Sequence, residues 1–297
     1  FSRVGFREKQ MSSDIVGKVL QNRYRVDQYL ASGGMASVFR VWDLDRNVPL
    51  AMKILHTDLA EDITILKRFR REAQALKKLV HPNIVPFYGL EQVGDTFFLL
   101  ERFIDGQNLK DILRQTPGHA LSVPETLSYL KAICAALGYA HANGVVHCDI
   151  KPGNIMVDQG GNIYLADFGI ARHSDSTTTT MAAAGTAAYM APEQILEEPV
   201  TPATDVYALG AMAFEMVTGR RPFRGDEEGD ESSGKTTGER LRDAHLHSKA
   251  PDPREYQPDI PTSLGESILK ALNKKPLDRF SAAMDFFEAL CKGAGID

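Results

Sequence analysis

The sequence predicts an α+β fold in which a strand-rich first part precedes a longer helical part. Short runs of β-branched and aromatic residues occur at Tyr24–Val26, Ser37–Trp42 and Pro49–Ile54, and turn residues separate them. Further along the chain, apolar residues recur every three or four positions, which is the period of an amphipathic helix. The 297 residues are enough for one large domain or for two lobes that share a cleft.

Two more strands are expected in the first part, at Ile84–Leu90 and Thr96–Glu101. A helix is expected between the third and fourth strands, over Glu61–Leu79, because its apolar residues keep the helical period. Glu72 lies beside that apolar stripe, so its side chain can point towards Lys53 while the stripe packs on the sheet.

The second part reads as a series of helices. Ser122 and Glu125 have the spacing of a capping box, which opens a helix that Asn143-Gly144 closes. An apolar helix runs from Asp205 to Val217 and stops at Gly219. Two final helices are expected at about Ser263–Leu272 and Ser281–Leu290. Residues 224–240 are acidic and rich in Gly and Ser, so we expect a flexible insertion there.

Composition excludes several classes of function. The net charge is −5, so no basic surface argues for nucleic acid or an anionic membrane as the main partner. The three cysteines, Cys134, Cys148 and Cys291, lack metal-ligand spacing and indicate free thiols in a reducing compartment. No apolar run has the length of a membrane span. We therefore expect a soluble, cytoplasmic domain, which can belong to a longer membrane-anchored protein.

The stretch from His147 to Asn154 carries the strongest chemical signal. It holds Asp149, Lys151 and Asn154, and Asp167-Phe168-Gly169 follows after one short hairpin-like segment. Each Asp or Asn alone is as readily explained as a turn former. Together, a carboxylate and an amide on one loop with a second carboxylate beyond a turn suit phosphoryl transfer with Mg²⁺.

Other motifs accompany this loop in a fixed order. They include a small-residue turn before Val38, Lys53 in Ala51-Met52-Lys53, and Ala191-Pro192-Glu193. With them, the chain resembles the eukaryotic-like (Hanks-type) Ser/Thr protein kinases, and the residues of its motifs are similar to those of bacterial members. The turn departs from the glycine pattern, because Ala31 and Ala36 stand where the first and third glycines are usual. A plain hairpin turn is the alternative reading of this turn alone.

The resemblance implies a two-lobed kinase fold with a small antiparallel sheet and one helix in the N-lobe and a larger, mainly helical C-lobe. It implies an N-terminal extension over 1–22, an N-lobe over 23–103, a C-lobe over 104–293 and a tail over 294–297. Within the extension, residues Phe1–Gln10 precede a Met and show no clear period, so we expect an expression scar or a processed leader there. The implied cofactors are ATP and Mg²⁺, with Mn²⁺ as a substitute.

The resemblance also assigns roles to individual residues. Asp149 would accept the proton, Lys151 would steady the γ-phosphate, and Asn154 and Asp167 would bind the metal. Lys53 and Glu72 would form the pair that positions the α- and β-phosphates. The remaining ATP-binding residues would be Ala31, Ser32, Gly33, Gly34, Met35, Ala36, Val38, Ala51 and the backbone of Arg102 and Ile104. Candidates for autophosphorylation are Thr178 and Thr180, and Thr186, Glu193, Asp205 and Arg279 would shape the substrate loop.

The expected activity is ATP- and Mg²⁺-dependent phosphoryl transfer to Ser and Thr hydroxyls of proteins, with a second copy of the chain as a partner during autophosphorylation. Two alternatives stay open: a pseudokinase that serves as a nucleotide-binding scaffold, and a small-molecule phosphotransferase. Cys148 stands where the family commonly has an Arg that pairs with a phosphate on the activation segment. We therefore expect that phosphorylation matters less here than in most relatives.

Overall fold

The computed structural model describes residues 15–32, 36–55, 73–94, 96–168, 187–225 and 236–296. The predictions for Gly33, Gly34, Met35, Glu72, Thr178, Thr180 and Thr186 lie outside these residues. By its internal contacts the chain divides into two units. Unit 1 holds the residues up to Val80 together with Val85–Ile104, and unit 2 holds His81–Ile84 and nearly all residues from Asp105 onward.

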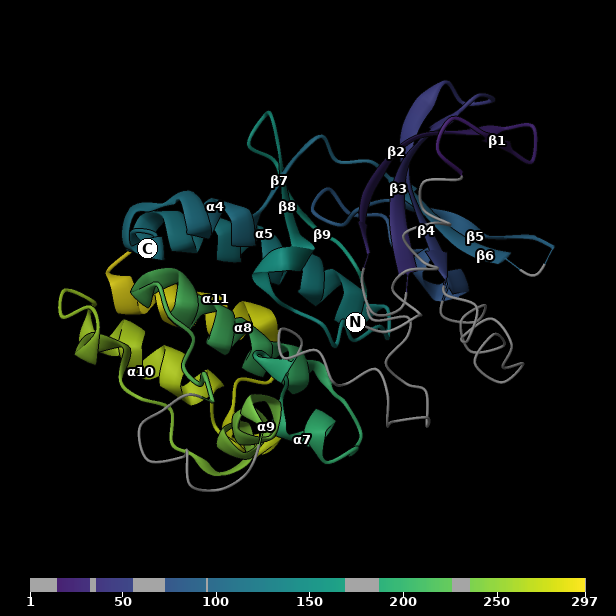
Figure 1. The fold of residues 1–297 in the computed structure, drawn as a ribbon. Coiled ribbons are helices and arrows are strands. Elements are labelled where there is room, and N and C mark those ends of the chain that lie inside the picture. Colours follow the sequence, from purple (N-terminus) through teal and green to yellow (C-terminus); the bar gives the residue numbers. More distant parts are fainter. Residues whose placement is uncertain are drawn as a thin grey trace. The chain divides into compact units, whose positions relative to one another are not determined.

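Unit 1 is built on a six-stranded antiparallel sheet (Figure 1). Its strands follow the spatial order β1-β2-β3-β4-β6-β5, so that β4 lies between β3 and β6. Their bounds are β1 Val19–Leu20, β2 Tyr24–Ser32, β3 Ala36–Asp43, β4 Val48–Leu55, β5 Phe87–Val93 and β6 Thr96–Arg102. The sheet confirms the prediction that the first part of the chain is rich in strands.

Alternation along β4 and β6 separates the two faces of the sheet. Leu50 and Met52 of β4 and Phe98 and Leu100 of β6 are buried in one apolar cluster. Successive side chains of a strand point to opposite faces, so Lys53 and Glu101 lie on the other face. One residue of register therefore decides which side chains join the core and which remain for chemistry.

The strand expected at Ile84–Leu90 begins only at Phe87. Pro86 has no N–H to donate to a ladder, so it limits pairing at this point. Ile84 instead forms an isolated parallel bridge with Leu165 in unit 2. The expected strand is therefore too long at its N-terminal end, where Pro86 interrupts the pairing.

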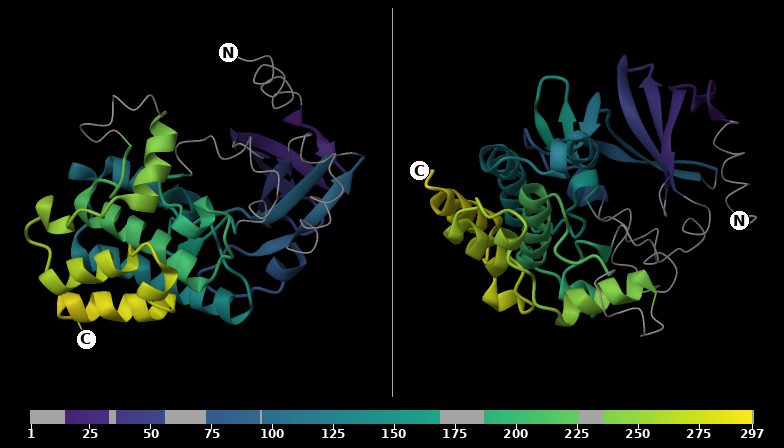
Figure 2. Two further views of the ribbon diagram at one scale, coloured as in Figure 1. Left: turned by 90° about the horizontal axis from the view of Figure 1, so that it is seen from below. Right: turned by 60° about the vertical axis from the view of Figure 1, so that its left-hand side comes forward.

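Unit 2 is mainly helical and carries a small three-stranded sheet in the order β7-β8-β9. The strands are β7 Gly106–Asn108, β8 Ile155–Asp158 and β9 Ile163–Leu165. Helices α10 and α11 pack together, and α11 also packs on α5 (Figures 1 and 2). The helices are α4 Leu109–Gln115, α5 Val123–Ala142, α7 Pro192–Ile195, α8 Pro202–Thr218, α9 Thr237–His247, α10 Thr262–Ala271 and α11 Ala283–Ala294.

The predicted helix signals work as expected at both ends of α5. Ser122 is the N-cap, its hydroxyl accepts from the Glu125 N–H, and the Glu125 carboxylate accepts from the Ser122 N–H at 2.9 Å. Asn143 is the C-cap and Gly144 follows with φ 73°. Gly219 likewise ends α8 in the left-handed region, where a side chain would be strained. Helix α8 is buried on almost every side, so it forms the centre of unit 2.

The insertion expected over 224–240 is wrong at its C-terminal end, because α9 already begins at Thr237. Thr236 and Glu239 form a capping box, and the Arg240 side chain donates to the Gly225 carbonyl at 2.7 Å. The polar composition of this segment suggested flexibility, although Thr236 is a favourable N-cap for a helix. Within the part of the chain that the structure describes, no helix is long and apolar enough to cross a membrane.

Candidate active site

The loop that follows α5 brings three predicted residues into contact. The Lys151 ammonium donates to Asp149 Oδ2 at 2.9 Å, and the Asn154 amide donates to the same oxygen at 3.1 Å. Asn154 also donates to the Asp149 backbone carbonyl at 2.8 Å. The Asp149 side chain is 17% exposed. Its carboxylate is therefore held in one orientation by two donors while it still reaches the surface.

The carboxylate of Asp205, in the first turn of α8, binds the backbone of this loop. Its carboxylate accepts the backbone N–H groups of His147 and Cys148, each at 2.8 Å, and the His141 Nε2 at 2.7 Å. Asp205 is 1% exposed, so its charge is compensated by these bonds rather than by water. Two consecutive N–H groups bound by one carboxylate fix the backbone where Cys148 takes φ 64°.

His147 links the loop to the segment that carries Asp167. Its Nδ1 accepts from the Asp149 N–H at 3.1 Å, and its Nε2 lies 2.9 Å from the Ala166 carbonyl. Burial lowers the pKa of His147, so the ring is neutral and its proton is on Nε2, where the carbonyl accepts it. The ring centroid also lies 4.5 Å from that of Phe168.

The residues that would hold a divalent cation are tied to each other through the backbone. The Ala166 N–H donates to the Asn154 carbonyl at 2.9 Å, and Asp167 follows with φ 59°. The Asn154 Nδ2 is directed at Asp149, so Oδ1 is the amide atom that can bind a cation. Amide and carboxylate oxygens suit Mg²⁺. Among the described residues no group of three or more His, Cys, Asp and Glu could hold a metal by itself.

Lys53 has a partner in unit 1 that sequence reasoning did not assign. Its ammonium forms an ion pair with the Glu101 carboxylate at 2.5 Å. Val38 and Ala51 are on the same face of the sheet, because Val38 is the register partner of Lys53 and Ala51 is that of Glu101. The expected partner, Glu72, lies outside the described residues. Of the two hinge residues, Arg102 ends β6 and Ile104 is buried.

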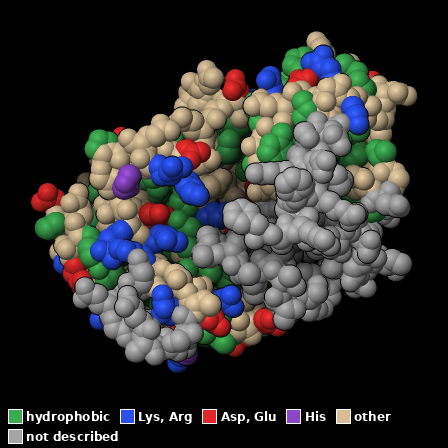
Figure 3. Space-filling view, in the orientation of Figure 1, with side chains coloured by type: hydrophobic (Ala, Val, Ile, Leu, Met, Phe, Trp, Pro, Cys, Tyr) green, Lys and Arg blue, Asp and Glu red, His purple; other side chains and the backbone are tan. Residues whose placement is uncertain are grey.

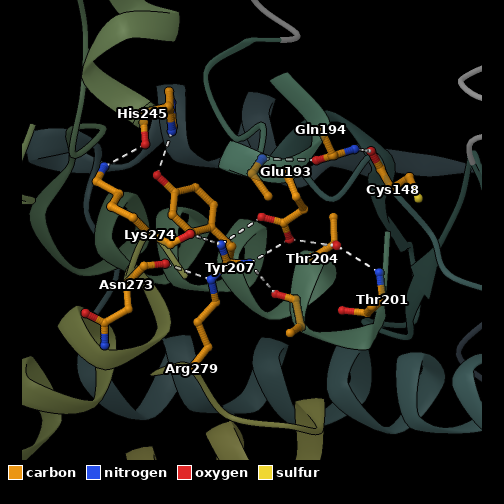
Figure 4. Close-up of polar contacts among 12 residues, drawn as sticks. Cys148, Glu193, Gln194, Thr201, Thr204, Tyr207, His245, Asn273, Lys274 and Arg279 are labelled. Atoms are coloured by element: carbon orange, nitrogen blue, oxygen red, sulfur yellow. Dashed lines mark hydrogen bonds and ion pairs between the residues drawn. The ribbon is translucent and has the colours of Figure 1, made fainter. Parts of the chain in front are cut away.

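Glu193 and Arg279, two of the residues predicted to shape the substrate loop, form an ion pair in unit 2 (Figure 4). Arg279 donates to both carboxylate oxygens, at 2.7 and 2.8 Å, and also to three backbone carbonyls. Thr204 donates to Glu193 at 2.8 Å. Burial alone would raise the pKa of Glu193, but the Arg279 hydrogen bonds and charge outweigh it, so the pKa lies below its ordinary value. Glu193 of α7 is therefore bound to α8 through Thr204 and to the segment between α10 and α11 through Arg279.

Two neighbouring contacts were missed by sequence reasoning. Gln194 of α7 donates to the Cys148 carbonyl at 2.9 Å and accepts from the Ala191 N–H at 3.0 Å, so it joins α7 to the loop of Asp149 (Figure 4). The Tyr207 hydroxyl bonds His245 Nδ1 at 2.8 Å, and burial lowers the pKa of His245 to about 3. No motif flags these residues, since a lone Gln or His is more often surface or core.

Figure 3 shows one face of the molecule. Lys and Arg side chains form separate groups on the described part of this face, with acidic side chains between them.

Comparison with known proteins places the chain in a family. The protein kinase domain model matches residues 24–289. The chain is 37% identical to the serine/threonine-protein kinase PrkC of Bacillus subtilis, over 91% of the chain and 40% of PrkC. It is 37% identical to the serine/threonine-protein kinase PknA of Mycobacterium tuberculosis, over 93% of the chain and 62% of PknA. It thus spans less than two thirds of these relatives.

A solved structure agrees. The PknI kinase domain of M. tuberculosis superposes with a TM-score of 0.75 at 26% identity, covering 95% of this chain and 99% of that one. The match confirms the α+β kinase fold predicted from the sequence. The chain belongs to the protein kinase domain family, within its bacterial Hanks-type serine/threonine branch.

Proposed function

We propose that this chain is the catalytic domain that transfers the γ-phosphoryl group of ATP to Ser and Thr hydroxyls of proteins. The observation that carries the proposal is the shared hydrogen bonding of Lys151 and Asn154 to one oxygen of Asp149. A carboxylate oriented in this way can accept the proton of an attacking hydroxyl. Its two donors remain beside it, so Lys151 can steady a phosphate and Asn154 a cation.

Each unit contributes its own groups. In unit 2, Asn154 and Asp167 would hold Mg²⁺, or Mn²⁺ in its place, and Asp149 would take the proton of the substrate hydroxyl. In unit 1, Lys53 would bind phosphate oxygens, and Val38 and Ala51 would offer the apolar surface of the sheet to the adenine ring. Mg·ATP, when bound, supplies the phosphoryl group and the charge that stabilises it in transfer. The neutral His147 ring positions Asp149, because its Nδ1 accepts from the backbone N–H of Asp149.

Three further assignments belong to the proposal. Thr178 and Thr180 would be autophosphorylated by a second copy of the chain, and Thr186 would contact Asp149 and Lys151. The hinge backbone at Arg102 and Ile104 would bind the adenine edge. The domain would work in the cytoplasm, where ATP is available and where its free cysteines, Cys134, Cys148 and Cys291, stay reduced.

The test is phosphate transfer from radiolabelled ATP to the protein itself and to a generic basic protein. We expect Mg²⁺-dependent labelling, mainly as phosphothreonine and phosphoserine. Asp149→Asn keeps the volume of the side chain and removes the proton acceptor, so labelling should fall by about 10² to 10⁴. Asp259→Asn is the matched control, since Asp259 is an exposed carboxylate of the same unit.

The outcomes separate the alternatives. Unlabelled wild type that still binds nucleotide would indicate a pseudokinase, and ATP consumption without protein labelling would indicate a small-molecule phosphotransferase. Near wild-type transfer by Asp149→Asn would show that the loop is assigned wrongly. A majority of phosphotyrosine would overturn the assignment of the acceptor.

A further inference from the structure

Glu101 occupies an unusual place for a carboxylate. It is the sixth residue of β6, after four consecutive buried apolar residues, and is only 8% exposed. The strand β4 beside it brings Ala51 opposite Glu101 and Lys53 opposite Leu99. Lys53 and Glu101 are therefore diagonal neighbours on one face of an antiparallel ladder, which long side chains can span.

The two charged groups are in contact and are largely shielded from solvent. The Lys53 ammonium lies 2.5 Å from Glu101 Oε2, and the side chains are 13% and 10% exposed. A carboxylate with this degree of burial is unfavourable unless a cation and hydrogen bonds compensate it. The apolar cluster of this sheet lies on the opposite face, so the pair does not serve to fill that core.

We propose that Glu101 is a positioning residue for Lys53, a carboxylate fixed on the sheet that holds the ammonium in the orientation in which it binds nucleotide phosphate. The inference rests on the proposed function. It differs from the expected pairing with Glu72 because Glu101 is fixed by the strand ladder itself. The ammonium has three N–H donors, enough for Glu101, Glu72 and a phosphate oxygen together.

The test compares two ligands on the folded protein. The affinity for Mg·AMP-PNP reports on phosphate binding, and the affinity for adenosine reports on the base and ribose alone. In Glu101→Gln we expect Mg·AMP-PNP to bind at least about tenfold more weakly, because the Lys53 ammonium loses its carboxylate partner and keeps only a neutral amide oxygen as acceptor. Adenosine affinity should change less than about twofold, since adenosine has no phosphate for Lys53. Isothermal titration calorimetry measures both.

A double-mutant cycle shows whether the effect passes through Lys53. In a Lys53→Met background, Glu101→Gln should leave the affinity for Mg·AMP-PNP unchanged, because the group it positions is gone. Glu91→Gln is the matched control: Glu91 lies in β5 of the same sheet and accepts from the Tyr24 hydroxyl at 2.7 Å. It should leave both ligands at wild-type affinity. Glu101→Met, with an apolar side chain of similar length, serves if the Gln variant unfolds, and the same losses are expected.

In transfer assays the Glu101 variants should show a raised KM for ATP with a smaller change in kcat. The inference is overturned if Mg·AMP-PNP affinity is unchanged, or if it rises, which would show that Glu101 competes with the nucleotide for Lys53. An equal loss for adenosine, or an equal loss in the Lys53→Met background, would also overturn it by showing a structural role. The binding cycle needs no catalysis, so an inactive wild type would refute the proposed function alone.

Discussion

The ion pair of Glu193 and Arg279 allows a stability prediction that can be worked from its contacts. Both side chains are buried, at 2% and 0% exposure, and the guanidinium makes five hydrogen bonds. Arg279→Met keeps an apolar stem and leaves the Glu193 carboxylate with the Thr204 hydroxyl as its remaining side-chain donor among the described residues. Breaking a buried pair in this way costs about 3–5 kcal/mol. We expect the free energy of unfolding to fall by this amount.

The stabilisation by this ion pair should depend on pH in a direction that follows from the pKa of Glu193. In the wild type the folded pKa of Glu193 lies below its unfolded value, so the stabilisation is complete above the unfolded pKa, about 4.3, and is lost as the pH falls through the folded pKa. In Arg279→Met the guanidinium that lowers the pKa of Glu193 is gone, whereas the burial that raises this pKa remains. Protonation of Glu193 should therefore reduce the loss of stability in the variant. The difference in unfolding free energy between wild type and variant should therefore be largest near pH 7 and shrink towards pH 4.

Urea unfolding of the wild type, Arg279→Met, Glu193→Leu and the double variant measures these quantities. The double variant should be more stable than the sum of the single losses predicts, because neither charge is then buried alone. A loss below about 1 kcal/mol at pH 7, or a difference that grows as the pH falls, would refute the reasoning.

Two further predictions concern turnover. Asp205→Asn should lower kcat at least about tenfold in a folded protein, because the backbone N–H groups of His147 and Cys148 lose a charged acceptor; affinity for Mg·AMP-PNP, measured in parallel, should change less. Changing Thr178 and Thr180 together to Ala should reduce transfer to an external substrate by less than about a hundredfold, because Cys148 cannot form a charge-assisted pair with phosphate. A larger fall in initial rates would disprove that reading of Cys148.

The elements of the fold were largely predictable because local signals and tertiary packing agree. The Ser122 capping box and Gly219 mark helix ends where the structure has them. The errors occur where a local signal is overruled or unread. Pro86 delays a strand whose apolar run begins at Ile84. Thr236 starts a helix inside a segment whose composition suggests disorder.

The candidate site was predictable to the extent that its residues are close in sequence. Asp149, Lys151 and Asn154 share one loop, so their contact follows from spacing. The partner of Lys53 did not follow, because its contact with Glu101 depends on the register of β4 against β6 across 48 residues. The sequence signal was a Glu directly after four apolar residues, Phe97–Leu100, and a shift of one residue in the ladder would have turned its side chain to the other face.

The arrangement around Cys148 gives the physical reason to expect weak control by phosphorylation. Its N–H is bound by the buried Asp205 at 2.8 Å, and its carbonyl accepts from Gln194 at 2.9 Å. The two bonds come from residues of α8 and α7, and they hold the Cys148 backbone at φ 64°. Neither bond requires a phosphate. Where an Arg needs a phosphate to complete its pairing, the loop can be ordered by modification. Here both backbone groups of Cys148 already have partners within unit 2, so a phosphate has less order left to supply.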